Sequence, residues 1–326
     1  MKLLVLAAGD PQQTASTIFR VAQFGQAWAK QGVDLHYIQR PSISRDILAQ
    51  VRSADVVLNQ KCVLNTSLGK AIRQASRRRV FDFDDAVWTR PGSDFSWFTR
   101  WRATSRLRWW MRESDVVIAA NGVLSEWARP YARCLREVGM ALDLSRWSPA
   151  PTRIERNFVQ VGWTGSPAYI HLLEELEPAM AEALRREPRL RFAIYSGARP
   201  AWKIPFEYVP YSPGTDVAFV RNLDIGLLPM HDDEFARGKS PIKALQYQAC
   251  GIPVVGNLVG AANELVDTAN GIPVKGANAW TTALVDLARD QIRRRRLGEN
   301  GLIRVRERHD ANTQAERLRS ILRGDS

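Results

Sequence analysis

The stretch FARGKSPIKALQYQACGIPVVGN, residues Phe235–Asn257, indicates how the chain folds. A loop leads into a predicted helix that begins near Ser240, and an apolar strand follows the Gly-Ile-Pro turn that closes the helix. A helix that leads into a short β-branched strand is typical of a parallel sheet covered on both faces. The stretch therefore predicts an α/β fold and directs attention to the beginning of this helix.

The same alternation extends through both halves of the chain. Strands and helices alternate from KLLVLAAG (2–9) to DVVIAAN (115–121), and again from FVQVGWTGS (158–166) to IPVVGN (252–257). The proline-containing segment 143–157 between them reads as a linker. We predict two doubly wound, Rossmann-like domains, 1–152 and 153–308, with a cleft between them, and a helix over 309–326 that packs back on the first. Ligands of such sheets bind beyond the carboxyl ends of the strands.

Composition narrows the class of protein. A length of 326 residues favours two domains, and a net charge of +12 favours polyanionic partners such as nucleic acid, anionic lipid or phosphorylated substrates. The 3 cysteines are widely spaced, which fits neither a disulfide framework nor a zinc site and indicates the cytoplasm. We interpret the opening MKLLVLAAG as a buried strand rather than a signal peptide. Dinucleotide and P-loop motifs are missing.

Two sets of residues suit an anion. The turn Thr164-Gly165-Ser166 follows a strand and could offer N–H groups and hydroxyls to a phosphate, or Ser166 could simply cap the next helix. The start of the helix in the opening stretch combines N–H groups with cations and suits a diphosphate. The alternative there is a solvated, capped helix with ordinary surface lysines. The residues of this second set are Arg237, Lys239, Ser240 and Lys243.

The segment DIGLLPMHDDEFARGKSPIKALQYQACGIPVVGNLVGAANELVDTANGIPV, residues 224–274, resembles the donor-site region of GT-B glycosyltransferases of the retaining family 4 type, also called glycosyl transferases group 1. The resemblance implies transfer of a sugar from a nucleotide-diphosphate sugar to a saccharide or lipid-linked acceptor. It further implies bacterial surface polysaccharide or glycoconjugate synthesis, with neither a cofactor nor a metal. Within the family, Lys239 would stabilise the leaving diphosphate, and backbone near Tyr211 would contact the base.

The sequence departs from the family at its E-x7-E motif. The two motif positions are Gly238 and Gln246, so both glutamates are missing. Gln246 could still hydrogen-bond the ribose, because an amide has both donors and acceptors. The acidic run Asp232–Glu234 just upstream could replace the first carboxylate, although a solvated loop is the simpler interpretation.

The first domain offers candidates for the acceptor side. Asp84 or Asp85, after the strand RVFDFDD, could position or deprotonate an acceptor hydroxyl. Alternatively these aspartates cap the helix that follows, with Asp82 bonded to backbone. The loop after the first strand would touch donor phosphate and acceptor, although Arg20 could instead lie on a solvated helix face. The candidates there are Gly9, Ser16, Thr17 and Arg20.

The segment Trp97–Arg112 is rich in tryptophan and arginine. It could lie on the anionic inner face of the cell membrane, or it could stack bases while contacting phosphates. Alternatively its tryptophans cover the sheet while its arginines face water. Two rival functions stay open: a nucleotide-sugar epimerase or hydrolase on the same fold, and a non-catalytic nucleotide- or nucleic-acid-binding module. The missing glutamates favour a non-catalytic module, whereas Lys239 and the Thr-Gly-Ser turn favour a transferase.

Overall fold

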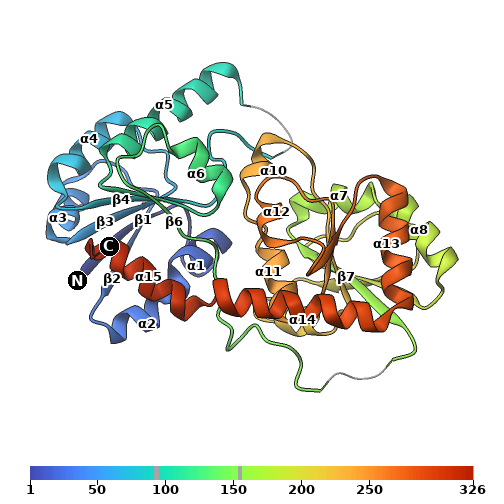
Figure 1. Cartoon of the computed structure of the whole chain (residues 1–326). Helices are drawn as coiled ribbons and strands as arrows, with labels where there is room; N and C mark the ends of the chain where they lie inside the picture. The colour runs from blue at the N-terminus through green and yellow to red at the C-terminus, as the bar shows by residue number, and fades with distance from the viewer. Residues whose placement is uncertain (92–94, 153–155, 326) are drawn as a thin grey trace. The chain divides into compact units, whose positions relative to one another are not determined.

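A computed structural model of the chain describes residues 1–91, 95–152 and 156–325. Its contacts divide the chain into two compact units, each built on one six-stranded sheet (Figure 1). Unit 1 comprises Met1–Ala141, Asp233–Ser240 and His309–Ser326, and unit 2 comprises Leu142–Asp232 and Pro241–Arg308. This division falls after Ala141, whereas the sequence placed a boundary between 152 and 153; residue 153 is outside the described residues.

The sheet of unit 1 is parallel throughout, in the order β2-β1-β3-β4-β5-β6. Its strands are β1 (Lys2–Ala7), β2 (Asp34–Gln39), β3 (Val56–Gln60), β4 (Arg79–Phe83), β5 (Val116–Ala119) and β6 (Leu135–Glu137). The helices of this unit are α1 (Ala15–Arg20), η1 (Ala22–Phe24), α2 (Gly25–Lys30), α3 (Arg45–Ser53), α4 (Thr66–Ala75), α5 (Trp97–Glu113), α6 (Gly122–Ala128), α10 (Glu234–Gly238) and α15 (Ala311–Arg323). The central strands β3 and β5 are buried along their whole length, as the apolar runs predict.

Two segments distant in sequence complete unit 1. The C-terminal helix α15 packs its apolar face into the core of this unit, and the indole Nε1 of Trp28 donates to the Ala315 carbonyl at 2.9 Å. The short segment Asp233–Ser240, which lies between two elements of unit 2 in the sequence, also belongs to unit 1. Unit 1 is therefore assembled from three stretches of the chain.

The segment between β1 and β2 is not one continuous helix, because the chain forms α1, η1 and α2 in succession. The break falls at Val21, whose φ of −140° and ψ of −55° leave the helical region. Arg20 before the break and Trp28 after it are both buried, with exposed fractions of 3% and 1%. A bend in this segment lets both large side chains enter the interior of unit 1.

Unit 2 repeats the architecture in the order β12-β11-β10-β7-β8-β9, again entirely parallel. Its strands are β7 (Val159–Gly165), β8 (Leu190–Ser196), β9 (Glu207–Pro210), β10 (Ile225–Leu228), β11 (Val254–Gly256) and β12 (Gly271–Pro273). Its helices are η2 (Pro167–Tyr169), α7 (Ile170–Glu174), α8 (Glu177–Arg186), α9 (Asp216–Arg221), α11 (Ile242–Ala249), α12 (Ala262–Leu265), α13 (Ala277–Arg289) and α14 (Gln291–Arg308).

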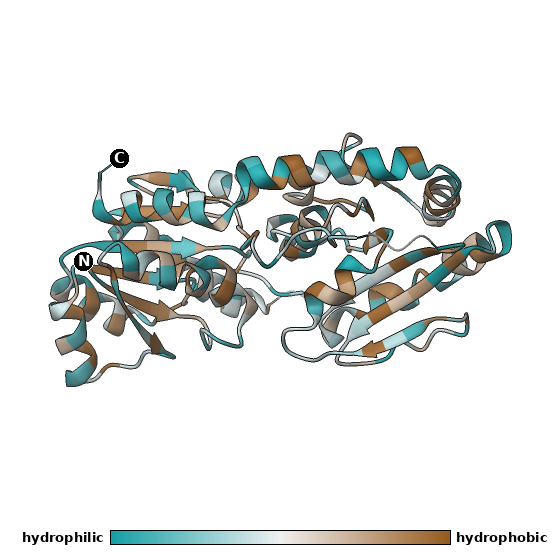
Figure 2. Cartoon of the chain, turned by 90° about the horizontal axis from the view of Figure 1, so that it is seen from below, coloured by the Kyte–Doolittle hydropathy of each residue, from teal (hydrophilic) through white to brown (hydrophobic). Residues whose placement is uncertain are grey.

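A helical segment of unit 2 is interrupted in the same way. The segment 171–187 forms α7 and α8 rather than a single helix, because Pro178 lacks a backbone N–H and begins a new helix at its first turn. The strands carry much of the hydrophobic colour in Figure 2, whereas the helices carry both colours, as expected for elements that face the core and water at once. Within the described residues, no helix is long and apolar enough to cross a membrane.

Candidate active site

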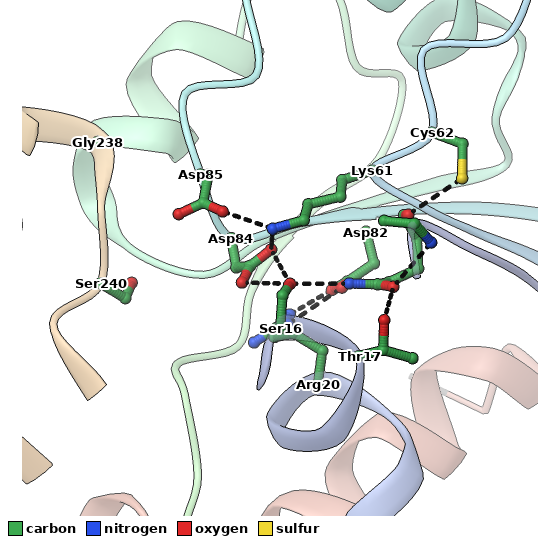
Figure 3. A network of polar contacts seen from close by, with 12 residues as sticks. Ser16, Thr17, Arg20, Lys61, Cys62, Asp82, Asp84, Asp85, Gly238 and Ser240 are labelled. Atoms are coloured by element: carbon green, nitrogen blue, oxygen red, sulfur yellow. Dashed lines mark hydrogen bonds and ion pairs between the residues drawn. The ribbon is translucent and has the colours of Figure 1, made fainter. Parts of the chain in front are cut away.

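In unit 1, charged side chains gather at the carboxyl ends of β3 and β4. Strand β4 ends in Asp82 and Phe83, and Asp84 and Asp85 follow at once. The parallel register pairs Gln60 of β3 with Asp82, so the next residue along β3, Lys61, lies at the same sheet edge. We call Lys61, Asp84 and Asp85 the carboxylate cluster (Figure 3).

Asp82 is engaged by Arg20. The Arg20 Nε donates to Asp82 Oδ2 at 3.1 Å, its Nη2 bonds the other oxygen, and its Nη1 donates to the Val138 carbonyl at 2.6 Å. Burial raises the pKa of Asp82, although the guanidinium opposes that shift. The solvated helix face considered for Arg20 is therefore wrong, and its contact with a ligand stays a prediction.

The carboxylate cluster shares one cation. The Lys61 Nζ lies 3.0 Å from Asp84 Oδ1 and 2.5 Å from Asp85 Oδ2. Burial alone would lower the pKa of Lys61, but Asp84 and Asp85 outweigh it and raise that pKa. Burial likewise opposes ionisation of Asp84, but Lys61 and the Ser16 hydroxyl hold the pKa of this carboxyl below its ordinary value. The pKa of Asp85 is raised, first by burial and then by the Asp84 charge.

The loop candidates support this cluster. Ser16 Oγ donates to Asp84, with its two oxygens at 2.8 and 2.6 Å, and accepts from Gln60 Nε2 at 3.0 Å. Thr17 is fully buried and donates to Gln60 Oε1 at 3.0 Å. Gly9 has no room for a side chain, because an added Cβ would lie 2.1 Å from Thr14 Oγ1. The structure thus places Ser16 at the cluster, while Thr17 stabilises its support.

The interpretation that Asp84 and Asp85 cap the following helix, with Asp82 bonded to backbone, is wrong. Residues 84–91 form bends and turns, so Asp84 and Asp85 cap no helix there. Asp82 pairs with a side chain rather than with backbone alone. Lys61 was not singled out from the sequence. The available signal was its position, one residue beyond a strand that neighbours the aspartate strand.

Of the acidic run Asp232–Glu234, Asp232 is exposed as a solvated loop predicts, whereas the other two residues are engaged by neighbours. Asp233 Oδ1 accepts from the Ala236 N–H at 2.7 Å and caps α10. Glu234 accepts from the Trp88 indole at 2.7 Å and from Arg100 at 2.8 and 2.6 Å. These bonds fasten α10 within unit 1 and leave Glu234 already engaged by an indole and a guanidinium.

The first motif position is closely packed. A Cβ at Gly238 would lie 2.9 Å from the Ala86 Cβ and 3.1 Å from Leu124 Cδ2. Asn121 Nδ2 donates to the Gly238 carbonyl at 3.0 Å and to Ser240 Oγ at 2.8 Å. Since a side chain would meet buried neighbours, the family's glutamate does not fit at this position without rearrangement.

Lys239 lies at the end of α10, within unit 1. Its Nζ is 5.4 Å from the centroid of the Phe235 ring, and its charge lowers the pKa of Asp85, although less than burial and Asp84 raise it. Arg237 is in the last turn of the same short helix. Whether Lys239 and Arg237 grip a diphosphate stays a prediction.

In unit 2, the Thr164-Gly165-Ser166 turn ends β7. The Thr164 N–H donates to the buried Tyr247 hydroxyl at 3.1 Å, and Lys243 Nζ lies 4.4 Å from the centroid of the Trp163 ring. A Cβ at Gly165 would lie 2.4 Å from that ammonium. The Trp163 ring would lie closer still, with its Cζ2 at 2.2 Å, so a side chain at position 165 would displace both the ring and the ammonium.

The capping role considered for Ser166 is confirmed. Its hydroxyl accepts from the Ala168 N–H at 3.4 Å, and Pro167 takes the first position of η2. The helix of the opening stretch, α11, begins at Ile242 with Pro241 at its N-cap, close to the predicted start. Gln246 faces the interior and is 8% exposed, whereas Tyr211 is 59% exposed, and its ring lies edge-on to Tyr195.

The carboxylates described above form ion pairs with cationic side chains. Within 1–91, 95–152 and 156–325, no group of three His, Cys, Asp or Glu side chains could hold a metal ion. Asp84 and Asp85 share the Lys61 ammonium as their ion-pair partner, and Asp82 pairs with Arg20. Binding of a hydroxyl-bearing ligand in unit 1 and of an anion at the turn in unit 2 stays a prediction.

Sequence comparisons agree with this chemistry. Residues 177–320 match a family model described as "Glycosyl transferase-like". The GDP-mannose-dependent alpha-(1-6)-phosphatidylinositol monomannoside mannosyltransferase of Mycolicibacterium smegmatis is 27% identical over 286 residues, covering 79% of this chain and 73% of the relative. A monoacylated-substrate counterpart from Corynebacterium glutamicum is 35% identical over 83 residues, which span 25% of this chain and 22% of that protein.

Solved structures share the fold over the whole chain. Sucrose-phosphate synthase from Thermosynechococcus elongatus superposes with a TM-score of 0.79 at 16% identity, covering 99% of this chain and 98% of that one. Anabaena HepE in complex with UDP gives a TM-score of 0.73 at 14% identity and covers 99% of each chain. These likenesses show the GT-B fold. The family model over residues 177–320 and the two mannosyltransferase relatives show in addition that the chain is similar to glycosyltransferases.

Proposed function

We propose that the chain transfers a sugar, with retention, from a nucleotide-diphosphate sugar to a hydroxyl of a saccharide or lipid-linked acceptor in bacterial surface glycoconjugate synthesis. GDP-mannose is the proposed donor, because both curated relatives are named GDP-mannose-dependent mannosyltransferases. The observation that carries the donor site is the Gly165 turn. It brings an ammonium close to Gly165 at the carboxyl end of β7, where ligands of doubly wound sheets bind.

Departure of the nucleoside diphosphate develops negative charge on its terminal phosphate. Lys243 and the first N–H groups of α11 supply fixed positive charge in unit 2, with Lys239 as a further candidate. Groups that stabilise this charge more strongly as it grows lower the barrier rather than only tightening substrate binding. Gln246, in the same helix, is the candidate for the ribose hydroxyls, with Tyr211 near the base.

A thermal-shift screen tests the donor site. GDP, GDP-mannose, UDP and UDP-glucose are added with and without EDTA to the wild type, Lys239→Ala and Lys243→Ala. A nucleotide at a hundred times its Kd stabilises the folded protein by about 2.7 kcal/mol. We expect a guanine-selective, EDTA-insensitive shift that Lys243→Ala weakens about tenfold in affinity, since a charge-assisted bond contributes about 1.5–3 kcal/mol.

The matched control is Lys275→Ala, which removes an exposed lysine of unit 2. It should bind nucleotide like the wild type. Binding by the wild type without turnover of any acceptor would favour the non-catalytic module, and no shift with any nucleotide would contradict the donor site. Retention is checked by the anomeric configuration of the product.

We further propose that the protein works at the inner membrane surface through the first turns of α5. Trp97, Phe98 and Trp101 are 80%, 49% and 61% exposed, whereas Leu107 and Trp110 farther along the helix are buried. The interpretation that the tryptophans of this segment cover the sheet is therefore wrong for Trp97 and Trp101. Exposed aromatic rings beside arginines are typical of binding to anionic lipid surfaces.

Vesicle co-sedimentation tests this surface. We expect binding to vesicles that contain anionic phosphatidylglycerol, weaker binding to pure phosphatidylcholine, and loss of binding in Trp97→Ala/Trp101→Ala. Ile292→Ala is the control, because Ile292 is an exposed apolar side chain of unit 2 at 83%. Equal binding by the double variant and the wild type would refute the role of α5.

A further inference from the structure

Lys61 has an unusual backbone at the carboxyl end of β3. Its φ is +47°, a value that residues with a side chain rarely adopt. Its N–H donates to the Asp82 carbonyl at 2.7 Å, and the next residue is held by Asn59, whose Oδ1 accepts from the Cys62 N–H at 2.9 Å. Such a conformation persists only where surrounding bonds enforce it, and strained residues concentrate at ligand sites.

This conformation places the Lys61 ammonium between two carboxylates (Figure 3). Asp84 also accepts from Ser16 through both oxygens, and its side chain is 6% exposed. The Asp85 side chain is 19% exposed, and its Oδ1 accepts no hydrogen bond from any residue that the structure describes. Asp85 is therefore the member of the cluster that can reach a ligand.

We propose that Lys61 is a positioning residue: its ammonium anchors Asp85 against Asp84 so that Oδ1 of Asp85 accepts a hydrogen bond from the acceptor hydroxyl. This inference rests on the proposed function, because it assigns the side chains that orient the acceptor. Lys61 itself does not touch the reacting atoms. Its conformation, its two ion pairs and the exposure of Asp85 carry the assignment.

Every charge that faces the cluster bears on its pH dependence. Asp85 is faced by Asp84, Lys61 and Lys239, and Asp84 is faced by Lys61, Arg20 and Asp82; the Asp82 charge also interacts with Lys61. The ionised Asp85 carboxylate accepts the hydrogen bond of the acceptor hydroxyl more strongly than the protonated carboxyl does, so transfer falls as pH falls through the Asp85 pKa. Removing the Lys61 charge raises that pKa further. The acid limb of the rate profile then moves to higher pH, by at least about one unit.

The experiment compares pH profiles of transfer for the wild type, Lys61→Met, Lys61→Arg and Arg40→Met. Arg40 is the matched control, because it is exposed and has a φ of +46°. Lys61→Met should lose about tenfold in kcat/KM at a pH below the limb and regain rate at high pH. Lys61→Arg, which keeps the charge, and Arg40→Met should keep the wild-type limb. An unmoved limb in folded Lys61→Met would overturn the proposal.

Two further measurements keep the proposal testable if a variant misfolds or transfer is not detected. Asp84→Asn removes the like charge beside Asp85, so its acid limb should move to lower pH; an unmoved limb counts against the proposal. The Asp85 carboxyl can also be titrated by 13C NMR, with its resonance assigned through Asp85→Asn. A higher Asp85 pKa in Lys61→Met, or a lower Asp85 pKa in Asp84→Asn, supports the electrostatic coupling within the cluster, and this measurement needs no substrate. Unchanged Asp85 pKa values refute that coupling. Failure of transfer with an intact coupling would then count against the proposed function alone.

Discussion

Gly238, where the family resemblance predicts a glutamate, offers the sharpest test of packing, because an added Cβ would meet buried neighbours. An alanine there would bring two Cβ atoms, those of positions 238 and 86, to 2.9 Å. Carbon atoms prefer about 3.5–4.0 Å, so the two segments must separate by roughly 0.6–1 Å. Overpacking of this kind costs about 1–3 kcal/mol. Alanine also reduces the conformational entropy of the unfolded chain, which stabilises the folded state by about 0.4–1 kcal/mol. Gly238→Ala should therefore destabilise unit 1 by about 1–2 kcal/mol.

The complementary change at Ala86 provides the internal check. Ala86 is fully buried, and Ala86→Gly alone should cost about 1–2 kcal/mol through backbone entropy and a lost methyl group. In the double variant Ala86→Gly/Gly238→Ala the clash is gone. The destabilisation of the double variant should therefore be smaller than the sum of the two single-variant values by about 1–2 kcal/mol. Gly238→Glu, which restores the motif residue, should lower the yield of folded protein rather than raise the transfer rate.

Calorimetry is the assay, because two compact units can unfold in separate transitions and a single fitted midpoint would mix them. Gly25→Ala is the control: its added Cβ has Leu35 Cδ2 at 3.7 Å as its nearest neighbour, an ordinary contact. That variant should match the wild type or exceed it. A Gly238→Ala variant as stable as Gly25→Ala, or strict additivity with Ala86→Gly, would refute the packing argument.

Two other buried interactions give further predictions. Arg20→Met leaves Asp82 buried without its cation and should destabilise unit 1 by about 3–5 kcal/mol, measured by urea unfolding. Without the guanidinium, the pKa of Asp82, already raised by burial, rises further above its value in the unfolded chain. The variant should therefore be least destabilised at low pH, and its loss of stability should grow as the pH rises through that pKa. A loss of stability that does not change with pH would contradict the burial of an unpaired Asp82 as the cause. Tyr247→Phe removes the acceptor of the Thr164 N–H at the donor turn and should cost about 1–3 kcal/mol, with weaker nucleotide binding in the same thermal-shift screen; unchanged binding and stability would show that water replaces the hydroxyl.

Hydrophobic pattern alone determined the two parallel sheets. Fully buried strands such as β3 and β5 must be apolar along their length, so the sequence itself records them. The start of α11 and the turn after β7 were also predicted from the sequence, because caps, glycines and prolines act over only a few residues. The family resemblance of residues 224–274 rests on these local features as well.

Only the tertiary structure decided which charges meet. Arg20 and Asp82 are 62 residues apart, and Glu234 is 134 residues from Arg100, so no local pattern specifies either pair. Lys61 joins the carboxylate cluster because β3 and β4 are neighbours in register and because its own φ is positive. Gly238 is explained only by Ala86 and Leu124 from another part of unit 1. A sequence records which residues prefer burial, whereas the partner of a buried charge depends on which strands lie side by side.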